Sequence, residues 1–282
     1  MNRSFRAAAV VVAIACALVA GCESRSTAPT SSKPIEIKQV TITGASTLAP
    51  LLSEIAKRFE QENPSIRIDV QTGGSSRGVS DTRSDLADIG MVSRDLKPDE
   101  GDLRRFRIAR DGVCLIVHKD NPVPSLSREQ IVSIYTGGIR NWKDVGGVDS
   151  PITVVNKAEG RSTLEVFTGH FKIDTRKVLA DVVIGDNEQG VKTIAGNPLA
   201  IGYVSIGTAE YNRESGVPIR LLPLEGIEAS VKNVANGTFP MSRTLHLVTK
   251  SEPQGAVKEV IEFATSPKVH DLVRGLSFVP IE

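Results

Sequence analysis

Strand-like and helix-like hydrophobic patterns alternate along most of the chain. Residues Ile66 to Val70 alternate between apolar and polar side chains, as a half-buried strand does. From Leu48 to Phe59 the apolar residues recur at the spacing of one helix face. Further short apolar runs predict strands at 40–43, 88–92, 152–155, 200–204, 219–222 and 245–248. Helical patterns recur at 127–135, 162–171 and 256–264. This alternation predicts an α/β protein with largely parallel sheets.

Val113 to Val117 forms a continuous apolar run within the segment GVCLIVH. Such a run is typical of a parallel strand that is buried on both faces. Cys114 lies in this run, so we interpret it as a small buried hydrophobic residue rather than a reactive thiol.

The N-terminal segment has the pattern of an export signal. Arg3 and Arg6 precede an apolar stretch from Ala7 to Ala20, which is too short to span a bilayer comfortably. It ends in the residues VAGC at 19–22, which resemble a bacterial lipobox. We therefore predict a signal peptide at 1–21, a lipid on Cys22 and a flexible Ser-, Thr- and Pro-rich tether at 22–34. The protein would be extracytoplasmic and held to a bacterial membrane by that lipid.

Charge and composition exclude several classes of function. Without Arg3 and Arg6, 32 of the 34 basic residues remain against 33 acidic ones, a net charge of −1. Because aromatic residues are also few, nothing indicates a nucleic-acid surface. The four histidines are scattered without ligand spacing, so we expect neither a metal site nor a cofactor.

Three strand-to-helix junctions share one chemistry. They read GAST at 44–47, GGSSRG at 73–78 and KAEGRST at 157–163. A helix N-terminus presents unpaired N–H donors and the positive end of the helix dipole. Glycine lets the backbone approach a ligand, and Ser and Thr add hydroxyl donors. Together the three junctions predict a binding site for an oxyanion.

Several longer segments resemble one family in their order along the chain. They are TGASTLAP, GGSS, ADIGMVSR, VHKDNPV, IYTGGIRNW, DVGG, NPLAIGYVSIG and FPMSRTLHLVTK. The chain resembles the short type of substrate-binding protein of the high-affinity phosphate ABC importer, over essentially all of residues 35–282. The resemblance implies a two-lobed periplasmic-binding-protein fold of class II, with a ligand cleft between the lobes.

The resemblance also implies the limits of the lobes. Lobe 1 would comprise residues 35–112 and 244–282, and lobe 2 residues 113–243. Two hinge strands would cross between them, near Val113 to His118 and near Thr244 to Thr249.

In this family the three junctions hold phosphate. The residues that match the family's phosphate-binding positions are Ser46, Thr47, Ser75, Ser93, Lys157, Gly160, Arg161, Ser162 and Thr163. In the third junction Lys157 stands where the family often has Arg, and Arg161 and Ser162 replace a Ser and a Gly. Gly160 and Thr163 keep the family's residues.

Ser93 is a further departure from the longer members of the family, which have Asp at this position. That Asp accepts the proton of hydrogen phosphate. A serine hydroxyl can accept the proton but carries no charge that would repel a fully ionised anion. The discrimination between phosphate and sulfate is therefore left open.

These features predict a phosphate-binding component of an ABC transporter, monomeric and not an enzyme, that delivers phosphate to permease subunits. A phosphate sensor, scavenger or adhesin on the same fold is an alternative. A serine hydrolase is another, because GSSRG at 74–78 matches G-x-S-x-G with Ser76 as the nucleophile. However, none of the four histidines lies in a recognisable loop setting, and no second motif supplies an oxyanion hole.

Overall fold

The computed structural model describes residues 37–281, so the predicted signal peptide, Cys22 and tether lie outside the described residues. The strands are β1 (Lys38–Gly44), β2 (Ile66–Thr72), β3 (Ile89–Val92), β4 (Arg104–His118), β5 (Thr153–Lys157), β6 (Val182–Ile184), β7 (Ala200–Ser205), β8 (Ile219–Leu221), β9 (Ser242–Thr249) and β10 (Val279–Pro280). The helices are α1 (Ala49–Glu62), α2 (Ser75–Arg83), α3 (Arg128–Tyr135), α4 (Ser162–Phe171), α5 (Asn187–Ala195), α6 (Ile206–Glu214), α7 (Val231–Ala235), α8 (Gly255–Ala264) and α9 (His270–Gly275). Each strand and helix that the hydrophobic pattern predicts is present, with its ends shifted by a few residues except in β4, which begins well before Val113.

The strands form one continuous mixed sheet. Along it the order is β2-β1-β3-β9-β4-β7-β5-β6, and β8 and β10 both pair with β4. β1 is parallel to β2 and β3, and β5 is parallel to β6 and β7. Every pair that involves β4 or β9 is antiparallel. The prediction of largely parallel sheets is therefore correct for the two outer parts of the sheet and wrong for its middle.

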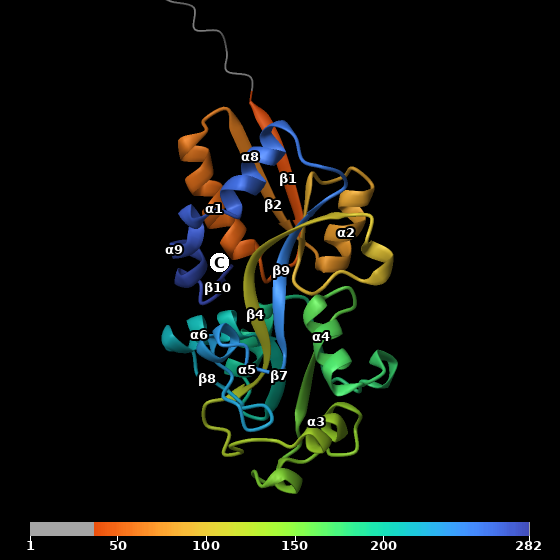
Figure 1. Ribbon diagram of the computed structural model, residues 1–282. Helices are drawn as coiled ribbons and strands as arrows, with labels where there is room; N and C mark the ends of the chain where they lie inside the picture. The colour runs from red at the N-terminus through yellow and green to blue at the C-terminus, as the bar shows by residue number, and fades with distance from the viewer. Residues whose placement is uncertain (1–36, 282) are drawn as a thin grey trace, which may run out of the picture. The chain divides into compact units, whose positions relative to one another are not determined.

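β4 changes its partners halfway along its length. Residues Arg104 to Gly112 pair with β9, whereas Val113 to His118 pair with β7 and β8. All of these pairings are antiparallel, so the prediction of a parallel strand at Val113 to Val117 is wrong. A continuous apolar run records burial on both faces, and it does not record the direction of the neighbouring strand. Figure 1 shows β4 and β9 running side by side between the two groups of helices.

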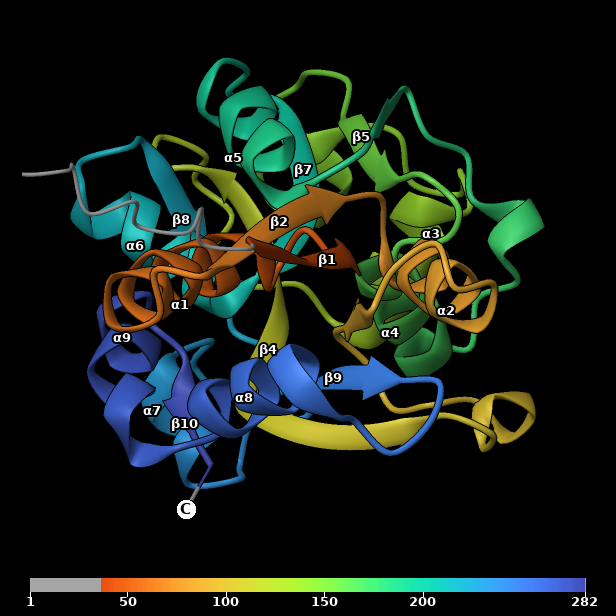
Figure 2. The same cartoon turned by 90° about the horizontal axis from the view of Figure 1, so that it is seen from above.

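The buried apolar residues gather into separate clusters. The largest draws its residues from 113–241 together with Val279, and a second draws them from 40–109 and 245–278. We keep the names lobe 1 and lobe 2 for the predicted ranges, 35–112 with 244–282 and 113–243. In lobe 1, α8 and α9 pack against α1, as Figure 2 shows from above.

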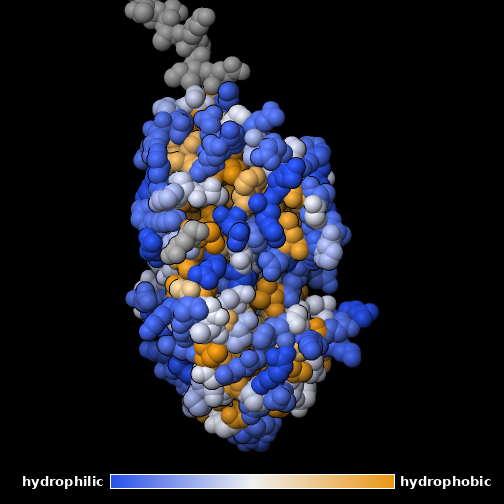
Figure 3. All heavy atoms as spheres, viewed as in Figure 1, coloured by the Kyte–Doolittle hydropathy of each residue, from blue (hydrophilic) through white to orange (hydrophobic). Residues whose placement is uncertain are grey.

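Surface and core differ as expected for a water-exposed protein. Leu48, Leu51, Leu52 and Ile55 of the α1 region are almost fully buried. The face of the molecule seen in Figure 3 carries mainly hydrophilic residues, with smaller groups of hydrophobic ones between them. Within residues 37–281, no helix combines the length and the apolar character that crossing a bilayer requires.

Candidate oxyanion site

The first junction places Thr47 between β1 and α1. Gly44 has φ +133°, and a Cβ there would lie 2.3 Å from the Met91 carbonyl oxygen, so only glycine allows this turn to pass so close to β3. Thr47 follows three residues later and is 3% exposed, just before α1 begins at Ala49. Ser46 is half-buried and lines a groove instead of entering the buried cluster.

That groove lies between the two lobes. It has a volume of about 380 Å³. Ser46, Ala49, Pro50, Ser53, Val70 and Thr72 line it from lobe 1, and Asp186, Asn187, Glu188 and Thr208 line it from lobe 2. Predicted residue Ser46 therefore lies at the rim of the site, where the lobes meet.

The second junction contributes Ser75, the first residue of α2. Its side chain is fully buried, and its Oγ accepts a hydrogen bond of 3.1 Å from the Ser93 backbone N–H. Ser93 follows β3 directly and is also fully buried. Its own Oγ lies 2.5 Å from the Oγ of Ser162 in lobe 2. Two of the predicted site residues, Ser93 of lobe 1 and Ser162 of lobe 2, thus meet across the lobes.

The third junction begins at Lys157, the last residue of β5, and ends at the N-terminus of α4. Gly160 has φ +76°, and Arg161 is the N-cap residue, although its side chain makes no capping hydrogen bond. Ser162 and Thr163 open the helix and are both buried. Gly160 has a contact that the sequence did not suggest: its carbonyl oxygen accepts a hydrogen bond of 3.3 Å from the Ser76 backbone N–H of lobe 1.

Arg243 joins the junctions together. This residue of β9 is 6% exposed, and its Nη2 donates to the Oγ1 of Thr47 over 3.3 Å. Its Nη1 donates to the Ser93 carbonyl oxygen (3.0 Å) and the Thr163 Oγ1 (3.4 Å). The guanidinium group therefore contacts the first and third junctions directly, and it reaches the second through Ser93, whose backbone N–H donates to Ser75.

Asp111 of β4 holds Arg243 in position. Its Oδ2 lies 2.7 Å from Arg243 Nη2 and 3.1 Å from Nε, and both side chains are almost completely buried. The other oxygen, Oδ1, accepts a hydrogen bond of 3.2 Å from the Gly207 backbone N–H. Both carboxylate oxygens of Asp111 are thus already occupied by donors of the protein itself.

Arg243 and Asn187 are two residues of this cluster that the sequence analysis did not predict. Asn187 is the first residue of α5 and is buried. Its Nδ2 donates to Thr47 Oγ1 (3.1 Å), and its Oδ1 accepts from Lys157 Nζ (3.1 Å). The available signals were weak: a lone Asn opening a helix, and a lone Arg at the start of an apolar strand inside the segment FPMSRTLHLVTK.

The charges of the site favour an anion. Lys157, Arg161 and Arg243 lie close enough to one another for their charges to interact, and Arg243 is paired with the buried carboxylate of Asp111. Burial above all, with Arg243 and Arg161 adding to it and Asp186 opposing it, lowers the pKa of Lys157 from 10.5 to about 7. The N-termini of α1, α2 and α4 add the positive ends of three helix dipoles. An anion with several oxygens would relieve this repulsion.

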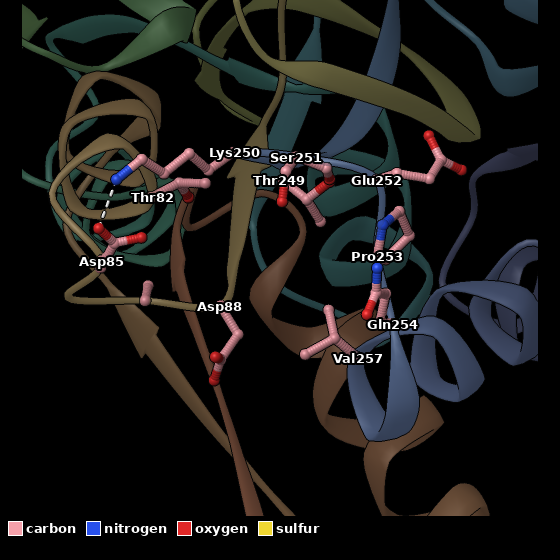
Figure 4. Close-up of a pocket in the computed structure, with 11 residues that line it drawn as sticks. Thr82, Asp85, Asp88, Thr249, Lys250, Ser251, Glu252, Pro253, Gln254 and Val257 are labelled. Carbon is pink, nitrogen blue, oxygen red and sulfur yellow. Dashed lines mark hydrogen bonds and ion pairs between the residues drawn. The ribbon is translucent and has the colours of Figure 1, made fainter.

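A separate pocket of about 400 Å³ lies on lobe 1 (Figure 4). Its labelled residues come from the end of α2 and the turn that follows it, from the end of β9 and the turn after it, and from α8. Lys250 forms an ion pair with Asp85 there. None of the nine predicted site residues lines it. Its carboxylates, Asp85, Asp88 and Glu252, make it unsuited to an anion.

Residues 37–281 give little support to a serine hydrolase, a metal site or a reactive thiol. The Oγ of Ser76 lies 3.4 Å from a carboxylate oxygen of Glu165, and within this range no histidine is among its hydrogen-bond partners. In the same range, no group of three or more His, Cys, Asp or Glu residues is placed to hold a metal ion. Cys114 is buried as predicted, and burial raises the pKa of its thiol well above the ordinary value.

Comparison with known proteins identifies the class. The model of the PBP superfamily domain matches residues 26–268, and the chain belongs to this superfamily of binding proteins. Among curated relatives, the phosphate-binding protein PstS of Bacillus subtilis is 30% identical over 86% of this chain and 80% of its own length. PstS of Borreliella burgdorferi is 24% identical over 87% of this chain and 91% of its own length. Within the superfamily, the chain belongs to the family of PstS phosphate-binding proteins.

Solved structures agree with this assignment. A putative phosphate ABC transporter substrate-binding protein of Clostridium perfringens, with bound phosphate, superposes with a TM-score of 0.80 at 31% identity, covering 87% of this chain and all of that one. An ABC-type phosphate transport receptor of Vibrio cholerae superposes with a TM-score of 0.70 at 29% sequence identity, covering 86% of this chain and all of that one. The two-lobed binding-protein fold predicted from the sequence is confirmed.

Proposed function

We propose that this protein captures inorganic phosphate between its two lobes and delivers it to the permease of an ABC importer. The observation that carries the proposal is that Arg243 bonds to Thr47 beside α1, to Thr163 of α4 and to Ser93, which is in turn bonded to Ser75 of α2. Lys157 and Arg161 add positive charge close by. The family membership and the relatives that bind phosphate support the same ligand.

The proposed ligand-binding residues extend the predicted set. They are Ser46, Thr47, Ser75, Ser93, Lys157, Gly160, Arg161, Ser162 and Thr163, to which the geometry adds Arg243 and Asn187. Hydrogen bonds that involve a charged group contribute roughly 1.5–3 kcal/mol each. Micromolar binding requires about 8 kcal/mol, so six such donors suffice even after the cost of bringing the lobes together.

Asp111 offers no free oxygen to the proton of hydrogen phosphate. Asp111 is a buried acid paired with Arg243, and its two oxygens are occupied by Arg243 and Gly207. The acceptor is therefore the hydroxyl pair of Ser93 and Ser162. A hydroxyl does not repel a fully ionised anion, so we expect sulfate to compete with phosphate more strongly than at a site with a free carboxylate.

Calorimetric titration of the phosphate-free protein with phosphate, arsenate and sulfate tests this function. We expect micromolar or tighter binding of phosphate, and roughly tenfold or greater weakening in each of Thr47→Ala, Ser75→Ala and Arg161→Ala. If all three variants bind phosphate as the parent does, the site is wrong. If the parent binds no oxyanion, the function is wrong.

The export of the protein completes the proposal. Residues 1–21 act as a signal peptide, Cys22 carries the lipid, and residues 22–34 tether a monomeric binding protein outside the cytoplasm. Mass spectrometry of the membrane-bound protein would show acyl chains on Cys22. The Cys22→Ser variant would leave the membrane fraction; a variant that stays there would contradict the anchor.

A further inference from the structure

Glu165 is the centre of a polar contact between the lobes that lies outside the proposed ligand set. It belongs to α4 of lobe 2, and its carboxylate faces three groups of lobe 1. Its Oε2 lies 2.6 Å from Arg94 Nε. Its Oε1 lies 3.2 Å from Lys97 Nζ and 3.4 Å from Ser76 Oγ. One carboxylate thus collects two cations and a hydroxyl from the opposite lobe.

Glu100, which also belongs to lobe 1, fixes the orientation of the Arg94 guanidinium. Nη1 and Nη2 of Arg94 donate to the two carboxylate oxygens of Glu100 over 2.6 and 2.8 Å, and both side chains are 6% exposed. This pairing uses one edge of the guanidinium and leaves Nε facing lobe 2. The Nε contact with Glu165 is an ion pair that lacks the alignment of a hydrogen bond.

The contact is adjacent in sequence to the site on both sides. Arg94 follows Ser93 directly, and Glu165 comes three residues after Ser162 on the same helix. Ser93 and Ser162 are the two residues whose hydroxyls meet at 2.5 Å. Separation of the lobes would break both contacts together, because each joins lobe 1 to lobe 2.

The energetics favour a role in holding the lobes closed. The side chain of Glu165 is 26% exposed, so the pair is only partly screened by water. When the lobes part, the carboxylate and Arg94 Nε regain water, so the pair contributes only to the closed form. A contact made only after closure affects the opening rate and leaves the rate of encounter unchanged.

We propose that Glu165 is a positioning residue that ties lobe 2 to Arg94 and Lys97 of lobe 1 and thereby slows the release of bound phosphate. The inference rests on the proposed phosphate function but not on any contact between Glu165 and the ligand.

Glu165→Gln tests it with the side-chain shape preserved. Glu225→Gln is the matched control, because Glu225 pairs with Arg128 within lobe 2 over 3.2 Å. Radiolabelled phosphate is chased from the protein with excess unlabelled phosphate, and its association is measured separately. We expect release to be roughly five- to twentyfold faster in Glu165→Gln, with association within about twofold of the parent. Glu225→Gln should match the parent in both.

A double-mutant cycle separates the contact of Glu165 with Arg94 and Lys97, called the latch below, from a general structural effect. Lys97→Gln, at a half-exposed position, should speed release less than Glu165→Gln, and the double variant should fall short of the product of the two effects. Higher salt should speed release from the parent more than from Glu165→Gln. Equal release rates in the parent, Glu165→Gln and Lys97→Gln would overturn the proposal.

A measurement without ligand keeps this test distinct from the phosphate function. Small-angle scattering of the phosphate-free proteins should show a larger radius of gyration for Glu165→Gln than for the parent and Glu225→Gln, with circular dichroism unchanged. If the parent fails to bind phosphate in the titration but this difference appears, the proposed function fails and the latch stands. If phosphate binds but neither release nor scattering changes, the latch fails alone.

Discussion

Lys157 should take up a proton when phosphate binds. In the phosphate-free protein, burial and the neighbouring arginines hold its pKa at about 7, so at pH 8.5 the amine is mostly neutral. Phosphate is a dianion at that pH, and its charge would restore the ammonium form. The expected uptake at pH 8.5 is therefore close to one proton for each phosphate bound.

The same linkage fixes the pH dependence of affinity. Above pH 7 the parent must protonate Lys157 in order to bind, so affinity should fall by roughly tenfold for each pH unit, or about 1.4 kcal/mol. In Lys157→Met the affinity at pH 7 is lower, and this slope is absent. The stability of the phosphate-free protein should rise with pH, whereas its phosphate affinity falls. The reason is that the unfolded chain binds more protons than the folded one between pH 7 and 10.5. In that window the unfolding free energy of the phosphate-free parent gains up to about 5 kcal/mol relative to Lys157→Met.

Titration calorimetry at pH 8.5 in two buffers of different ionisation enthalpy measures the uptake directly. The parent should show heats that differ between the buffers by about one ionisation enthalpy, and Lys157→Met should show nearly equal heats. Equal heats for the parent would refute the reasoning, because the charge state of Lys157 would then be the same with and without phosphate.

Two further predictions concern Arg243 and Gly74. Arg243→Met should abolish measurable phosphate binding and lower the unfolding free energy by about 3–5 kcal/mol, because Asp111 is left buried without its partner. Adding Asp111→Asn should restore stability in urea denaturation but not binding, and restored binding would exclude Arg243 from the site. Gly74→Ala should weaken binding roughly tenfold or more, since its Cβ would lie 2.6 Å from the Gly160 oxygen of lobe 2. Gly146→Ala, at φ +83° with open space around it, carries similar backbone strain and should bind phosphate normally, so equal weakening in both variants would point to strain alone.

The elements of the fold were predictable because their information is local. The helical spacing of apolar residues predicted α1, and the limits of α4 followed from the junction at Ser162 and the run to Phe171. The chemistry of the junctions was equally local, since Gly, Ser and Thr before a helix indicate donors wherever the helix lies. Thr47 and Ser75 are both buried, and their role as ligand donors stays a prediction.

Strand direction could not be read in the same way. The run from Val113 to Val117 is apolar because both of its faces are covered, and this holds for parallel and antiparallel neighbours alike. Only the path of β4 and β9 through the sheet decided that these strands pair antiparallel.

The sequence by itself determined the alternating elements, the three donor-rich junctions and, through its resemblance, the family. Only the tertiary structure decided that Arg243 would stand 3.0 Å from the carbonyl of Ser93, 150 positions earlier in the chain, with Asp111 behind it. An isolated arginine in a strand has no local signature of function, because its partners come from other elements. Its role is set by which buried groups the folded chain brings within hydrogen-bonding distance.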